Sequence, residues 1–134
     1  MKKYILLAAA ASILAFALIK AVKYVRHWLI VRKVKEKWSD LQKFCASRET
    51  WPLAIITADK LLDEALKNKK FKGKSMGERL VSGQRIFSDN DGLWFSHNLA
   101  KKLMDETAVR LRQADVKRSL LGVRQALRDI GVLE

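Results

Sequence analysis

The chain has 134 residues, a formal net charge of +13, 49% hydrophobic residues and one cysteine. This length accommodates one domain, and a single cysteine excludes an internal disulfide framework. One cysteine and two widely separated histidines also exclude a structural zinc site. The excess of positive charge favours an anionic partner, either a membrane surface or a nucleic acid.

The first quarter of the chain predicts a membrane anchor. Residues 1–33 hold seven lysines and arginines and no acidic residue, and residues 4–19 (YILLAAAASILAFALI) are uncharged. As a helix, this uncharged stretch is about 24 Å long, somewhat short of the hydrocarbon layer. Extension to Val25 matches that layer if the intervening lysines reach the interface. We therefore predict a single membrane-spanning anchor over residues 1–26.

Bases and aromatic residues, typical of a membrane interface, follow the uncharged stretch. The predicted interface residues are Lys20, Lys23, Tyr24, Arg26 and Trp28. We predict a basic juxtamembrane helix over residues 27–37, in contact with anionic headgroups. Because the larger positive charge follows the helix, the positive-inside rule predicts a single-pass protein of the cell membrane with a cytoplasmic C-terminal domain.

The sequence leaves two alternatives to an anchor open. The lysines at 2–3 and the small residues at 15–17 (AFA) fit a cleaved secretory signal. Cleavage there would leave a mature chain that begins with several bases, which opposes export. A buried helix of a soluble protein is the other alternative. The flanking charges favour a retained anchor.

Residues 38–134 predict a helical domain. Helical spacing of apolar residues, a capping-box pattern in SMGE (75–78) and a turn at SDNDG (88–92) divide the chain from residue 34 onward into helices. The predicted helices cover about 34–47, 51–66, 75–87, 93–106 and 115–130. No segment shows the alternation of a strand. The predicted fold class is all-α, with an N-terminal transmembrane helix and a bundle of four to five helices.

Two short motifs lack the residues that a ligand-binding loop needs. GKS (73–75) has Asn68 where a phosphate-binding loop needs its first glycine, and DNDG (89–92) has Phe87 where an EF-hand needs an acid. We therefore predict no metal site, no cofactor and no catalytic residue.

Two segments offer candidate contact residues. Residues 67–74 (KNKKFKGK) present lysines to the phosphates of RNA or lipid, or form only a solvated connection. The helix over 93–106 has an apolar half and a polar half, with His97 at the border. A catalytic role for His97 needs an orienting partner, and Asp105 lies about 12 Å farther along the helix. The candidate contact residues are Trp94, His97, Lys101 and Asp105, together with Lys67, Lys69, Lys70, Lys72 and Lys74.

Four segments resemble small membrane-anchored bacterial proteins of uncharacterised function, whose soluble domain is similar to the HEPN superfamily (higher eukaryote and prokaryote nucleotide-binding). The segments are WPLAIITADKLLDEALK, GKSMGERLVSGQR, LWFSHNLAKKLMDE and LLGVRQALRDIGVL. The resemblance covers roughly residues 38–133 and implies a helical bundle. In HEPN ribonucleases an Arg, usually followed by a polar residue, and a His four to six residues later meet across a dimer and cleave RNA.

In this resemblance, Ala100 stands at the position of the arginine and Asp105 at that of the catalytic histidine. Lys101 takes the place of the polar residue, His97 matches a leading histidine, and Glu106 keeps a trailing acid. Because neither catalytic side chain is present, the resemblance implies that RNA cleavage has been lost.

The sequence thus favours a non-enzymatic interaction module that forms a homo-oligomer or binds another protein. The alternative is a membrane-tethered domain that binds RNA or a nucleotide. An active ribonuclease is the least favoured interpretation of the sequence.

Overall fold

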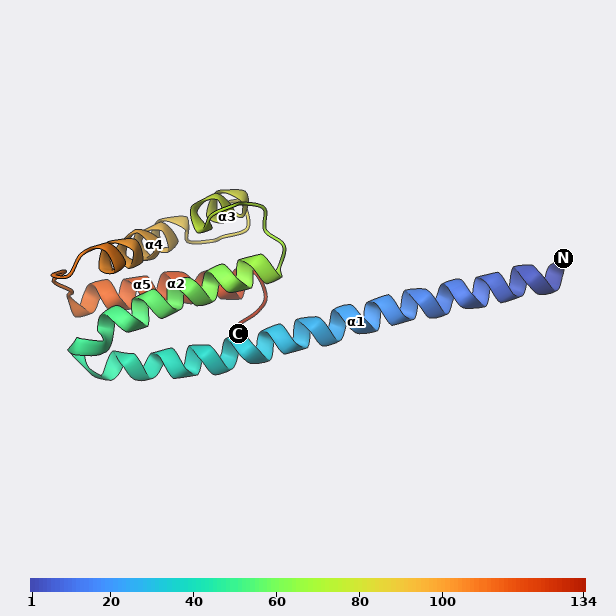
Figure 1. Ribbon diagram of the computed structural model, residues 1–134, viewed down its shortest axis with the longest axis horizontal. Helices are drawn as coiled ribbons and strands as arrows, with labels where there is room; N and C mark the ends of the chain where they lie inside the picture. Colours follow the sequence, from blue (N-terminus) through green and yellow to red (C-terminus); the bar gives the residue numbers. More distant parts are fainter.

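The computed structural model describes all 134 residues and confirms the predicted all-α fold class. α2 and α5 lie between the C-terminal half of α1 on one side and α3 and α4 on the other (Figure 1). Two short 3-10 turns, Lys43–Ala46 and Arg48–Thr50, join α1 to α2. The helices in chain order are α1 (Lys2–Gln42), α2 (Trp51–Asn68), α3 (Met76–Ser82), α4 (Asn90–Asp105) and α5 (Gln113–Asp129).

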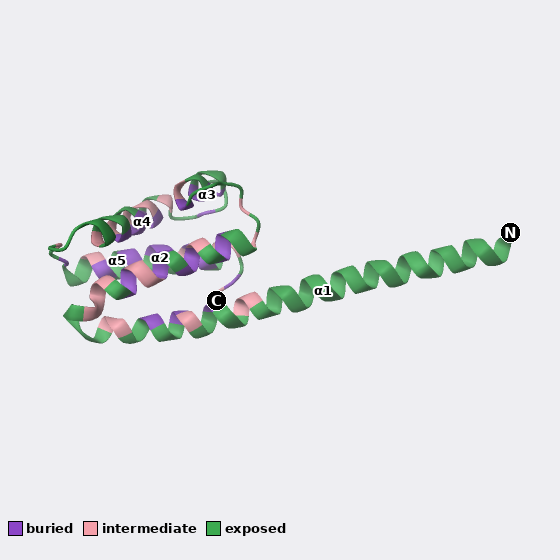
Figure 2. Ribbon diagram, in the orientation of Figure 1, coloured by how far each residue is buried: buried purple, intermediate pink, exposed green.

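α1 is one unbroken helix of 41 residues, about 62 Å long. Residues 1–42 contain neither glycine nor proline, so nothing in the sequence interrupts the helix between its apolar stretch and the bundle. The predicted juxtamembrane segment, 27–37, lies in the C-terminal half of α1. Residues 1–29 are all exposed and project beyond the bundle (Figure 2).

The C-terminal part of the same helix belongs to the core of the bundle. Val34, Trp38 and Leu41 lie on one side of α1 and are buried, and this part of the helix packs on α2. The packed core thus begins four residues before residue 38, the predicted start of the domain. The main core cluster also contains Ala58, Leu61, Leu62, Ala65, Leu66, Met76, Leu80, Phe87, Leu93, Val123, Ala126, Leu127 and Val132.

The reversal between α1 and α2 is fixed by side-chain hydrogen bonds. The hydroxyl of Thr50 donates to the carbonyls of Phe44 and Ser47. The indole N–H of Trp51 donates to the carbonyl of Cys45 at 3.1 Å. The carbonyl of Ser47 also accepts from the backbone N–H of Thr50 at 3.1 Å. These bonds tie the end of α1 to the start of α2, so the hairpin of the two helices has a defined geometry.

α4 and α5 approach each other at two glycines. A Cβ atom on Gly122 of α5 would lie 2.6 Å from the carbonyl carbon and oxygen of Gly92 in α4. Backbone atoms cannot move aside as a flexible side chain can. Gly122 therefore allows the close contact between these two helices.

We predict that Gly122→Ala destabilises the protein by about 1–3 kcal/mol, because the new methyl group overpacks the contact between α4 and α5. The measurement is chemical denaturation of the full chain in detergent, followed by circular dichroism. Gly77→Ala in α3 is the matched control, because its Cβ would have only ordinary contacts, the nearest at 3.7 Å. Equal stability of the two variants would contradict the packing described here.

Candidate interaction surfaces

The side of α4 that is buried differs from the side that carries most of its apolar residues. The difference corresponds to a rotation of the helix about its axis. Leu93, Ser96, His97 and Ala100 are buried, whereas Met104, which belongs to the predicted apolar half, is 51% exposed. Two of these four residues are polar, and each has a polar partner on another helix. The interior of the bundle therefore contains specific polar contacts as well as apolar packing.

His97 forms a buried pair with Asp59 of α2. Its Nδ1 lies 3.0 and 3.2 Å from the two carboxylate oxygens of Asp59, and the residues are 8% and 6% exposed. Next to a carboxylate, Nδ1 carries the proton and donates. Trp94 packs edge-on against the imidazole, with ring centroids 5.9 Å apart. The expectation that His97 joins a contact surface therefore does not hold, because its ring is used inside the bundle.

Two further polar contacts hold the helices together. The hydroxyls of Ser96 in α4 and Ser119 in α5 are hydrogen bonded to each other and fully buried. The guanidinium of Arg79 in α3 donates to Asp63 of α2 at 2.7 Å and to the carbonyl of Gly73 at 2.8 Å. Breaking a buried pair of this kind leaves an uncompensated polar group, so each contact specifies how its helices meet.

The other predicted contact residues of α4, Trp94, Lys101 and Asp105, form one line along its outer side together with Asn98, which was not predicted as a contact residue. Trp94, Asn98, Lys101 and Asp105 are spaced by four, three and four residues, which places them on one face of the helix. Trp94 is half-buried and the other three are exposed. Neither Lys101 nor Asp105 forms an ion pair within the chain. We call these four residues the α4 strip.

The positions that the HEPN resemblance assigns to catalysis differ in their surroundings. Ala100 is fully buried in a small cluster with Ile55, Leu111 and Val116. Asp105 is the last residue of α4 and is exposed. Of the two positions, one therefore lies inside the bundle and the other on its surface.

The five lysines of residues 67–74 lie at the end of α2 and in the connection to α3. Four are exposed, and Lys69 is half-buried because its ammonium donates to Nδ1 of His27 in α1 at 2.9 Å. Lys67 pairs with Asp63 at 3.3 Å. Lys70, Lys72 and Lys74 have no acidic partner, and these three residues therefore present free positive charge.

The predicted membrane-interface residues are all exposed on the projecting part of α1. The ammonium of Lys20 lies 5.0 Å from the ring centroid of Phe16, and the guanidinium of Arg32 lies 5.6 Å from that of Trp28. Cationic and aromatic groups therefore stand together where the apolar stretch ends, as at a membrane interface.

A basic stripe on α5 was missed in the sequence. Lys117, Arg124 and Arg128 are exposed at helical spacing and form no ion pair. The acid nearest along the chain, Asp129, accepts hydrogen bonds from Ser88 and Gln125 instead. Partial burial of Asp129 opposes ionisation, but these hydrogen bonds and the nearby charge of Arg128 prevail and hold its pKa below the usual range. The stripe could have been found from the spacing of its bases, with Leu121 between them.

Asp59 was also missed, although the sequence carries a signal for it. It lies four residues after Ile55 and three before Leu62, inside the apolar stripe of α2. An acid at such a position implies a buried partner, because an unpaired carboxylate is costly to bury. The identity of that partner, 38 residues away, does not follow from spacing.

Comparison of the chain with models of protein families, with curated proteins and with solved structures finds no match.

We predict that His97→Ala and Asp59→Ala each destabilise the protein by about 2–4 kcal/mol, because either change leaves a buried polar group without its partner. Since the two side chains interact, the double variant should lose clearly less than the sum of the two. Chemical denaturation of all three variants measures this coupling. Lys102→Ala, at an exposed position of α4 that forms no ion pair, is the control. Additive losses would show that the pair contributes no interaction energy.

Proposed function

We propose that this protein is a single-pass membrane protein whose cytoplasmic helical domain is a non-enzymatic interaction module that self-associates. The observation that carries the proposal is the division of α1. Its first 29 residues are exposed and largely apolar, whereas its last turns are packed into the bundle. The same rigid helix thus supplies both an anchor and part of the domain.

The exposed apolar surface of α1 supports the anchor. By length and composition, α1 is long enough and apolar enough to cross a bilayer. None of its most apolar 18-residue stretch is buried within the protein. Water-soluble monomers rarely expose such a surface, since burying it in lipid is strongly favourable. The exposed large hydrophobic residues between positions 4 and 22 are Tyr4, Ile5, Leu6, Leu7, Ile13, Leu14, Phe16, Leu18, Ile19 and Val22.

The use of the interior polar groups supports a non-enzymatic role. Asp59 and His97 bind each other, and neither lines a described pocket. A catalytic base has to reach a proton of the substrate. In the HEPN resemblance, Ala100 and Asp105 stand at the positions of the two side chains that cleave RNA in the ribonucleases. Both observations favour a domain that binds and does not catalyse.

The α4 strip supports self-association because it carries one positive and one negative side chain, Lys101 and Asp105, which can pair with the same two residues of a second copy. If two copies of α4 pack antiparallel about a twofold axis, Lys101 of one copy faces Asp105 of the other, and the converse also holds. The twofold axis then lies beside residue 103. Half-buried Trp94 is about 13 Å away along the helix, so the charge pairs carry this contact.

We predict that Lys101→Glu and Asp105→Lys each weaken self-association, because each places like charges opposite one another across the twofold axis. The double variant restores the opposite charges and should recover association. Sedimentation of the full chain in detergent, over a range of protein concentrations, measures the monomer–oligomer equilibrium.

Lys102→Glu is the matched control, because Lys102 is exposed on α4 and lies outside the strip. It should leave the equilibrium unchanged within experimental error. A wild-type chain that stays monomeric at all concentrations would contradict self-association. Failure of the double variant to recover would contradict the pairing of Lys101 with Asp105.

The basic stripe of α5 favours RNA binding at the membrane as a second candidate function. Lys117, Arg124 and Arg128 are free to contact phosphates, and their spacing spans about three turns of the helix. Arg118, on the same helix, has its guanidinium 4.3 Å from the ring centroid of Phe95. This candidate function does not require cleavage.

If the α5 stripe binds RNA, affinity for a generic single-stranded RNA should fall steeply with salt, with a logarithmic slope of about −2 for three phosphate contacts. Arg124→Gln with Arg128→Gln should reduce that slope. Titration at several salt concentrations, with the RNA recovered on a gel, measures both binding and integrity. Flat salt dependence would exclude the stripe as a phosphate-binding surface, and cleavage of the RNA would contradict a non-enzymatic domain.

A further inference from the structure

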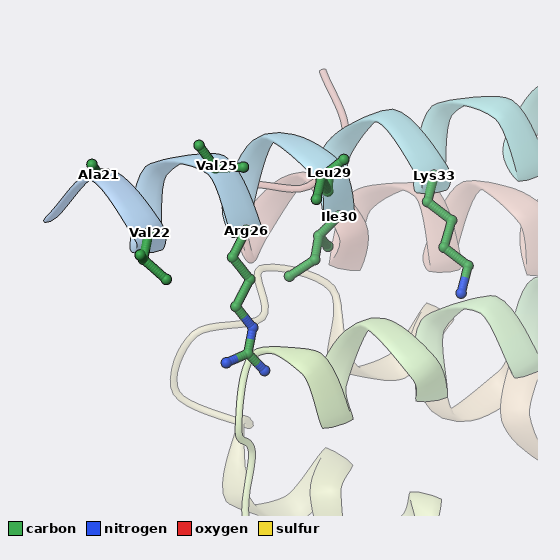
Figure 3. Close-up of a pocket in the computed structure, with 7 residues that line it drawn as sticks. All are labelled: Ala21, Val22, Val25, Arg26, Leu29, Ile30 and Lys33. Carbon is green, nitrogen blue, oxygen red and sulfur yellow. The ribbon is translucent and has the colours of Figure 1, made fainter. Parts of the chain in front are cut away.

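The lysine-rich connection lies beside the part of α1 where the apolar stretch gives way to bases. The 2.9 Å contact between Lys69 and His27 fixes this position. His27 is only two residues beyond Val25, where the predicted span ends, a rise of about 3 Å along the helix. Figure 3 shows Arg26 and Ile30 pointing from α1 toward the end of α2 and the segment that follows it.

This part of α1 also has an apolar groove of about 530 Å³ bordered by cations. Its apolar lining comes from Ala21, Val22, Val25, Leu29 and Ile30, and its charges come from Arg26 and Lys33 (Figure 3). Apolar side chains next to guanidinium and ammonium groups match the boundary between acyl chains and phosphate headgroups.

The backbone of the connection is held in place. The carbonyl of Gly73 accepts a hydrogen bond from the buried side chain of Arg79 at 2.8 Å. The backbone N–H of Lys74 donates to the carboxylate of Glu78. The ring of Phe71 stacks on Phe87, with centroids 6.2 Å apart. The lysine side chains are therefore presented by a fixed backbone.

Lys70 occupies a backbone conformation that glycine prefers. Its φ is +63°, in the left-handed region that ends many helices. A side chain there is unfavourable, and glycine would relieve the cost. The backbone N–H of Phe71 donates to the carbonyl of Leu66 at 3.0 Å, so Lys70 closes the end of α2 at a position where glycine would cost less.

The chemistry of the connection favours phosphate headgroups over RNA bases. Lys70, Lys72 and Lys74 have no acidic partner, so their charge is available to an anion. Single-stranded RNA is usually held by aromatic rings that stack on its bases as well as by charge. The only aromatic ring of the connection, Phe71, is already stacked on Phe87.

We propose that the connection between α2 and α3 docks on the anionic phospholipid headgroups of the membrane that α1 enters. The domain then has two membrane contacts, the helix and the lysine-rich connection. This inference rests on the membrane anchoring proposed above. Lys70, Lys72 and Lys74 bind the phosphates electrostatically, and α1 sets their distance from the surface.

The experiment uses the isotope-labelled full chain in lipid nanodiscs that carry a paramagnetic headgroup label. One set contains only zwitterionic phosphatidylcholine, and the other contains phosphatidylglycerol as well. We expect backbone amide signals of residues 69–75 to broaden several-fold more in the anionic discs, because each lysine near such a surface gains about fivefold in local affinity. High salt should remove the difference.

Lys70→Gln, Lys72→Gln and Lys74→Gln, combined, should abolish the extra broadening. The matched control changes Lys43, Lys60 and Lys102 to glutamine, with the same loss of charge at exposed positions elsewhere, and should leave it intact. Equal broadening in both kinds of disc, or in the two triple variants, would overturn docking. A connection whose signals shift with single-stranded RNA but not with anionic lipid would overturn it in favour of a nucleic-acid surface.

A label in the acyl chains separates this result from a failure of anchoring. Broadening of residues 8–18 by that label reports insertion of α1. Loss of the headgroup effect alone would overturn docking only, whereas loss of both effects would overturn the anchor as well.

Lys70→Gly tests the strained position separately. It should raise the melting temperature and at the same time reduce broadening of the connection in anionic discs. A higher melting temperature with unchanged broadening would show that the charge of Lys70 is not used at the membrane.

Discussion

The packing of Val34, Trp38 and Leu41 into the bundle is the contact on which the rest of the structure depends. These residues belong to the same unbroken helix as the exposed apolar stretch of residues 4–19. A helix without glycine or proline does not bend sharply, so the bundle has a fixed orientation relative to the projecting half of α1. The end of α2 is therefore next to that half, whereas the connection between α4 and α5 lies at the opposite end of the bundle (Figure 1).

Paired polar groups determine how the other helices meet. Asp59 with His97 joins α2 to α4, and Ser96 with Ser119 joins α4 to α5. Apolar packing alone permits small rotations of a helix about its axis, whereas a buried hydrogen bond permits one arrangement. This explains why the buried side of α4 includes a histidine and a serine while Met104 is exposed. It also leaves the α4 strip facing outward, where it is available for the self-association that we propose.

Local patterns predicted most of the secondary structure, because capping and amphipathic spacing act within a few residues. The hydroxyl of Ser75 accepts from the N–H of Glu78 as its motif implies, and α4 ends at Asp105, one residue before the predicted end. The contacts that define the candidate surfaces are long-range. Asp59 meets His97 across 38 residues and Lys69 meets His27 across 42, and no periodicity encodes such pairs.

We propose that α1 passes from lipid into the core of the bundle as one helix. A scan of single nitroxide labels along residues 4–41, with Cys45 changed to serine and the chain in lipid vesicles, tests it most directly. We expect labels on residues 4–19 to be accessible to oxygen dissolved in the lipid and protected from an aqueous nickel reagent. From Ile30 onward, both accessibilities should fall with helical periodicity at Val34, Trp38 and Leu41. Aqueous accessibility throughout residues 4–19, or a break in periodicity between the two regions, would contradict it.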